Sequence, residues 1–115
     1  MKLQASRTWT VAACAALWAL GTGSAVAMDD DAVKALLKKS ECTKCHAIDK
    51  DKKGPSYQKV AKDNKGKADA EAKLIKSITS GAKVKLSDGS EEEHKKIASK
   101  DDKEIKGLVQ WILKQ

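Results

Sequence analysis

The chain has 115 residues, 23 of them basic and 16 acidic, and its aromatic residues are three tryptophans and one tyrosine, with no phenylalanine. A chain of this length forms one small domain, and so few aromatic side chains leave its core short of apolar material unless something else fills the centre. The formal net charge of +7 suits an acidic partner. The lysines are spread along the chain without aromatic residues between them, so we do not expect nucleic-acid binding.

Residues 1–27 have the pattern of a cleaved export signal. Lys2 and Arg7 precede the apolar run WTVAACAALWALG, and Ala25 and Ala27 stand where a signal peptidase reads small residues. The apolar run is shorter than the roughly 20 residues that a membrane span needs. We therefore predict cleavage rather than a retained anchor.

Cleavage would leave residues 28–115 as the mature domain, exported to the periplasm of a Gram-negative bacterium and without a membrane span. Lipid attachment at Cys14 is the alternative, because VAAC has suitable small residues. The apolar core follows this cysteine rather than preceding it, which disfavours a lipid anchor.

The mature chain opens on DDDAVKALLKK, whose acidic start and regularly spaced apolar residues predict a helix. That helix leads directly into SECTKCHAID, in which Cys42, Cys45 and His46 form the pattern Cys-x-x-Cys-His. A local disulfide and a zinc site completed by His94 are two possible uses of these residues. The third is covalent haem, in which two thiols add to the vinyl groups and the next imidazole binds iron. The pattern is typical of this third use, and we predict one haem c (heme c) attached through Cys42 and Cys45.

Two further helices are expected in the middle of the chain. Gly54-Pro55 ends a charged loop, and the proline suits the first turn of a short helix that carries Tyr57. A longer helix is expected from about Asp69 until Gly81 stops it.

The segment after the third helix lacks a helical period, and Asp88-Gly89 marks a turn. Ser90 followed by Glu93 has the spacing of a capping box, which predicts a short helix bearing His94.

A final helix is expected to begin at Asp101 or Asp102, because apolar residues recur after it at helical spacing. Gly107 inside it suggests a close helix crossing. No strand pattern is visible, so the predicted class is all-α, with four to five helices.

Three segments resemble a small bacterial class I cytochrome c: KALLKKSECTKCHAIDKDKKGPSYQKVAKD, DAEAKLIKSITSG and DDKEIKGLVQWILKQ. The resemblance implies a class I cytochrome c fold wrapped around one haem, with the first and last helices crossing. It also implies thioethers at Cys42 and Cys45, iron ligation by His46, and a hydrogen bond from Nδ1 of His46 to the carbonyl of Pro55. Such a bond would orient the ring.

Two aromatic residues complete the expected haem environment. Trp111 is expected to pack against the haem, with its indole N–H reaching a propionate. Tyr57 is expected in the core, with its hydroxyl on a polar partner.

Lysines are concentrated on either side of the motif, where this family exposes the haem edge. They could steer an acidic redox partner, although solubility alone would also explain them. These lysines are Lys34, Lys38, Lys39, Lys44, Lys50, Lys52 and Lys53.

The chain departs from the family at the second axial ligand, which is usually a methionine between the third and last helices. Its only methionines are Met1 and Met28, neither of which lies there. His94 is the predicted replacement, with Lys83, Lys85, Lys95 and Asn64 as minor options. Ligation by His46 and His94 would lower the reduction potential relative to Met/His ligation.

Two functions remain open at this point. One is a one-electron carrier with low-spin iron held by two histidines. The other is a ligand-binding or redox-switched protein in which His94 is absent from the iron or leaves it on reduction, so that NO, CO or O₂ can bind and a proton is taken up. No nucleophile is paired with a base, so an enzyme is not expected, although a cytochrome subunit of a larger oxidoreductase remains possible.

Overall fold

The computed structural model describes residues 28–115, and the predicted export signal lies outside the described residues. The elements follow one another along the chain as α1 (Asp30–Lys39), the 3₁₀ turn η1 (Cys42–Lys44), α2 (Tyr57–Asn64), α3 (Ala70–Ser80), β1 (Lys83–Lys85), β2 (Glu91–Glu93) and α4 (Asp102–Leu113).

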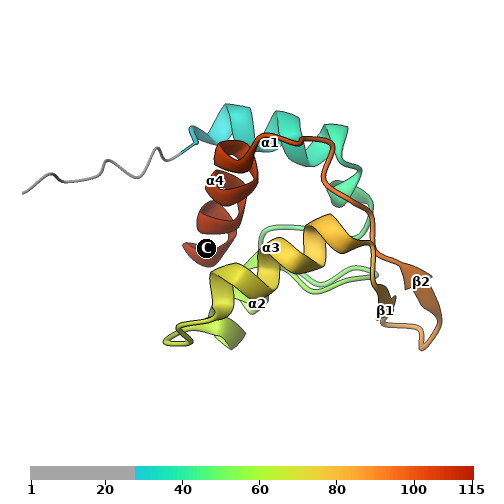
Figure 1. Ribbon diagram of the computed structural model, residues 1–115. Helices are drawn as coiled ribbons and strands as arrows, with labels where there is room; N and C mark the ends of the chain where they lie inside the picture. The colour runs from blue at the N-terminus through green and yellow to red at the C-terminus, as the bar shows by residue number, and fades with distance from the viewer. Residues whose placement is uncertain (1–27) are drawn as a thin grey trace, which may run out of the picture.

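The four helices confirm the mostly helical class. Figure 1 shows α1 and α4 meeting at one end of the domain, with α2 and α3 at the other and the two short strands projecting to one side. Helix α4 packs against both α2 and α3. The central buried cluster draws on α1, α2 and α4 and consists of Val33, Leu36, Leu37, Tyr57, Leu108 and Ile112.

Helix α1 forms where its local signals predict. The Asp29 side chain accepts a hydrogen bond from the backbone N–H of Ala32 at 2.8 Å, which caps the first turn. Acidic residues occupy the first turn and lysines the last, so both ends suit the helix dipole. Its apolar face is buried, as the spacing of Val33, Leu36 and Leu37 requires.

Helix α4 begins after Asp101, whose side chain accepts from the backbone N–H groups of Lys103 and Glu104. Gly107 is closely approached, but by a side chain from two residues before α1 rather than by another helix. A Cβ at this glycine would lie 2.7 Å from Cγ of Met28. The Met28 side chain would have to move to accommodate any other residue there.

Helix α2 starts two residues after Pro55, so this proline is not in its first turn as expected. Ser56 is the capping residue, and its hydroxyl accepts from the N–H of Lys59 at 3.1 Å. Helix α3 ends as predicted, with Gly81 in the left-handed conformation at φ 66°.

The prediction of no strands, and of a short helix after Ser90, is wrong. Residues 83–85 and 91–93 pair as an antiparallel hairpin, in which Lys83 lies opposite Glu93 and Lys85 opposite Glu91. These pairings set opposite charges face to face, which stabilises adjacent strands. The segment after β2 is extended and leads to α4 without a further helix.

No helix within residues 28–115 is long and apolar enough to cross a membrane.

Candidate functional site

An apolar cavity of about 270 Å³ lies between the four helices. Each of α1, α2, α3 and α4 contributes aliphatic side chains to its wall, including Leu37, Val60, Leu74, Ile78, Leu108 and Ile112. Six of the seven predicted site residues also line it, namely Cys42, Cys45, His46, Pro55, Tyr57 and His94. The fold therefore brings residues that are far apart in sequence around one apolar space.

The cysteine motif follows α1 through a sharp turn. Glu41 takes the left-handed conformation at φ 60°, and η1 then brings the N–H groups of Cys45 and His46 onto the carbonyl of Cys42. Both cysteines are half-buried free thiols, and burial raises the pKa of the Cys42 thiol. Ion pairs with Lys44 and then Lys95 hold the pKa of the Glu41 carboxyl below its usual value.

His46 is held in one orientation by its neighbours. Its Nδ1 lies 2.6 Å from the carbonyl oxygen of Pro55. A carbonyl can only accept, so Nδ1 donates and Nε2 keeps its lone pair free. Burial lowers the pKa of this imidazole, while the bond to Pro55 acts in the opposite direction. Gly54 closes the other side, since a Cβ there would lie 2.7 Å from Cε1 of His46.

His94 faces His46 across the cavity. The centroids of the two rings are 6.1 Å apart, and the ring planes differ by 49°. Nδ1 of His94 lies 2.8 Å from the carbonyl oxygen of Lys95, which again leaves Nε2 free. Two metal–nitrogen bonds of about 2 Å, with about 1 Å from each nitrogen to its ring centre, would separate the centroids by about 6 Å.

Tyr57 lies beside His46, and its ring stacks on the imidazole with a centroid distance of 5.5 Å. Its hydroxyl is buried and has no hydrogen-bond partner among residues 28–115. Burial raises the pKa of Tyr57, so this hydroxyl remains a donor at neutral pH. A buried donor without a partner costs free energy, and a bound group with an acceptor at this point would remove that cost. The cavity therefore fits a largely apolar cofactor with polar substituents, as haem is.

Trp111 has a different place from the predicted one. Its indole N–H donates to the Asp30 carboxylate at 2.8 Å, and its ring meets Tyr57 edge to face at 5.7 Å. It does not line the cavity. The indole N–H therefore has its partner at the start of α1, and the Trp111 ring packs against the ring of Tyr57.

The other uses considered for the cysteine motif find no support in residues 28–115. No group of three or more His, Cys, Asp or Glu side chains there could hold a metal ion, which disfavours the zinc site.

Met28 packs against Gly107 of α4 and does not line the cavity, so its sulfur is not placed as an axial ligand.

Ser40 and Gly54 are residues near the site whose contacts the sequence did not reveal. The Ser40 side chain is buried, and its hydroxyl accepts a hydrogen bond from the N–H of Ala98 at 2.9 Å. In the sequence Ser40 reads as an ordinary helix end. No local pattern indicates a partner 58 residues away.

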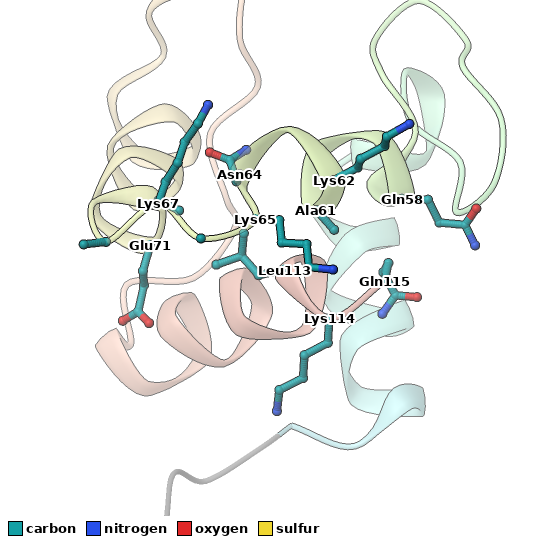
Figure 2. A pocket seen from close by; sticks show the side chains of 13 residues that line it. Gln58, Ala61, Lys62, Asn64, Lys65, Lys67, Glu71, Leu113, Lys114 and Gln115 are labelled. Carbon is teal, nitrogen blue, oxygen red and sulfur yellow. The ribbon is translucent and has the colours of Figure 1, made fainter.

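A second hollow, of about 660 Å³, lies between the α2–α3 turn and the C-terminal residues (Figure 2). Its lining mixes apolar and polar side chains and contains the lysines Lys62, Lys65, Lys67 and Lys114. It contains no cysteine or histidine and shares no lining residue with the apolar cavity. It is therefore a surface groove separate from the candidate haem site, and we call it the lysine groove.

Comparisons with known proteins agree with this geometry. The family model described as cytochrome c matches residues 31–115. Cytochrome c-551 of Allochromatium vinosum is 32% identical over 78 residues, which cover 68% of this chain and 80% of that protein. Cytochrome c-551 of Pseudomonas aeruginosa is 45% identical over 47 residues, 41% of this chain and 45% of that protein.

Two solved structures are similar to this one. The crystal structure of the class 1 cytochrome MtoD from Sideroxydans lithotrophicus ES-1 has a TM-score of 0.72 and 57% identity, covering 76% of this chain and 97% of that one. Wild-type cytochrome c552 of Nitrosomonas europaea has a TM-score of 0.55 and 26% identity, covering 70% and 96%. Members of this class carry electrons and are not enzymes.

The family match, the spacing of Cys42 and Cys45 and the apolar cavity beside them lead to one conclusion. The chain belongs to the cytochrome c family, as a small monohaem class I cytochrome that attaches one haem c through Cys42 and Cys45.

Proposed function

We propose that this chain is a periplasmic one-electron carrier whose haem iron is held by His46 and His94. The observation that carries the proposal is the pair of imidazoles facing each other across the cavity with their centroids 6.1 Å apart. In both rings a backbone carbonyl occupies Nδ1, which leaves Nε2 as the atom free to bind a metal.

The haem supplies one-electron redox chemistry when it is bound. Around it, Cys42 and Cys45 anchor the macrocycle, and the carbonyl of Pro55 fixes the His46 ring. The aliphatic wall excludes water, and the Tyr57 hydroxyl is available to a polar substituent. Two imidazole ligands in both oxidation states would keep rearrangement small and the reduction potential below that of a Met/His site.

Redox partners are proposed to approach the haem edge beside the motif. The loop after His46 carries the exposed residues Lys50, Lys52 and Lys53 and the exposed apolar residue Ile48, together with Asp49 and Asp51. A loop with net positive charge and an exposed apolar side chain suits a weak encounter with an acidic protein, which salt would weaken.

A second candidate function is supported by the setting of His94. No residue between Leu86 and Ile105 is buried, and Ile97 is the one residue of this stretch that packs, partly buried, against the core cluster, so few apolar contacts hold the segment that carries this histidine. If His94 leaves the iron on reduction, a small ligand such as CO or NO could take its place.

Visible spectra of the purified haem protein, oxidised and reduced and each with and without CO, distinguish the two candidates. Low-spin bands in both states and no CO uptake are expected for the electron carrier. The His94→Ala variant should then become high-spin and bind CO. A wild-type protein that is already high-spin when reduced would contradict ligation by two histidines and favour the second candidate.

Export can be tested separately, by fractionating a Gram-negative host and sequencing the N-terminus of the haem-staining protein. Cleavage before Met28 is the expected result. A product that retains residues 1–27 would contradict it.

A further inference from the structure

The segment that carries His94 is attached to the residues just before the cysteine motif at two points. The N–H of Ala98 donates to the hydroxyl of Ser40 at 2.9 Å. The ammonium group of Lys95 lies 3.2 Å from the Glu41 carboxylate. Ser40 and Glu41 immediately precede Cys42, so these two contacts join one side of the cavity to the other.

The same segment is tied to the end of α3 by backbone bonds. The N–H of His94 donates to the carbonyl of Ala82 at 3.0 Å, and that of Ile97 to the carbonyl of Ile78 at 2.8 Å. These bonds fix one edge of the segment but do not cross the cavity. Among the hydrogen bonds and ion pairs of residues 28–115, only the contacts to Ser40 and Glu41 tie it to the cysteine side.

Ser40 is well placed to hold a neighbouring backbone. It is 4% exposed, although serine is mostly found at the surface, and it ends α1. Removing its hydroxyl would leave the partly buried N–H of Ala98 without a partner.

Glu41 has a backbone conformation that glycine would adopt more easily. It is the one residue other than glycine with a positive φ among residues 28–115. A glycine would turn the chain here at less steric cost but would lack the carboxylate that pairs with Lys44 and Lys95. The side chain, rather than the turn, accounts for a glutamate at this position.

We propose that Ser40 and Glu41 are positioning residues that hold His94 in place to bind the haem iron. Ser40 holds the backbone N–H of Ala98, four residues after His94, and Glu41 pairs with Lys95, the residue next to His94. Together we call them the Ser40–Glu41 clamp. The inference rests on the proposed ligation by His94 and adds what keeps that ligand from leaving.

The rate at which cyanide binds the oxidised haem protein tests the clamp, because cyanide can enter only when His94 is away from the iron. Glu41→Gln should raise this rate about two- to fivefold, as expected for loss of an exposed ion pair. Ser40→Ala should raise it about tenfold, because the backbone N–H of Ala98 loses its acceptor. Ser40→Thr keeps a hydroxyl and should stay near the wild-type rate.

Glu41→Gly separates positioning from general stability. This variant relieves the left-handed backbone and removes the carboxylate, so its thermal midpoint should not fall while its cyanide rate rises as in Glu41→Gln. Asp63→Asn is the matched control, since it removes the exposed ion pair between Lys59 and Asp63 in α2, away from the cavity. Its cyanide rate should equal that of the wild type.

Two kinds of failure are distinguishable. If His94→Ala leaves the spectrum and cyanide rate of the wild type unchanged, His94 is not a ligand and the proposed function fails together with the clamp. If His94→Ala becomes high-spin but the Ser40 and Glu41 variants keep the wild-type cyanide rate, the ligation stands and the clamp is overturned. Faster hydrogen exchange at the amide of Ala98 in Glu41→Gln would support the clamp independently of the iron, and an unchanged exchange rate would count against it.

Discussion

His46 shows how little freedom a single residue keeps in this site. Its Nδ1 is bound to Pro55, its ring stacks on Tyr57, and Gly54 leaves room for its edge. The hydrogen bond to Pro55 was expected from the family resemblance. The sequence does not reveal the need for glycine at position 54. A close approach between the backbone of Gly54 and the ring of His46 leaves no periodic pattern in the sequence.

Gly54→Ala tests this packing. The added methyl group would lie 2.7 Å from Cε1 of His46, so the ring or the loop must move. We expect a loss of about 1–3 kcal/mol in the free energy of unfolding, together with a shifted Soret band in the haem protein. Gly66→Ala is the control, because its positive φ makes alanine costly but no atom lies near the new Cβ. It should lose about 1–2 kcal/mol and keep the wild-type spectrum. A normal spectrum in Gly54→Ala would show that His46 does not depend on this contact.

At the scale of elements, the helices were predictable because their ends are encoded locally. Asp29 and Asp101 cap α1 and α4, and Gly81 ends α3. The hairpin was missed because its signal lies across the two strands rather than along either one. Ser90 and Glu93 have capping-box spacing, but the register places Glu93 opposite Lys83, and Ser90 instead bonds to Asp88 in the turn.

Charge reversal across the hairpin tests which signal governs this segment. Lys83→Glu places a second carboxylate opposite Glu93. This change should lower the free energy of unfolding by about 0.5 kcal/mol. Adding Glu93→Lys restores opposite charges in the reversed order and should recover most of that loss. Denaturant unfolding of the wild type, both single variants and the double variant gives the coupling energy. If the losses of the two single variants simply add, the pair makes no contribution.

For the whole molecule, the short chain and its few aromatic residues predict that another group fills the centre, and the structure agrees. The buried cluster surrounds a cavity that its own side chains do not fill. The sequence could not show where the exposed lysines gather, because position in a fold depends on contacts between distant segments. Two groups of exposed lysines lie apart in the structure, one in the loop beside the motif and one in the lysine groove, which shares no lining residue with the cavity.

This separation allows a test of whether the position of the charge, and not only its total, governs electron transfer. The probe is ferricyanide, an anionic oxidant, reacting with the reduced haem protein at physiological ionic strength. Reversal of Lys50 and Lys53 to glutamate should slow the reaction severalfold, because both lysines lie in the loop that ends at the cavity residue Gly54.

The matched control is reversal of Lys65 and Lys114, which changes the net charge by the same amount in the lysine groove (Figure 2). We expect a smaller effect, because screening at physiological ionic strength acts over about 8 Å and distant charges contribute less to the field at the haem edge. The difference between the two variants should also fade as salt is added. Equal slowing by both would mean that the net charge alone attracts the oxidant, and the loop beside the motif would then have no special part in docking.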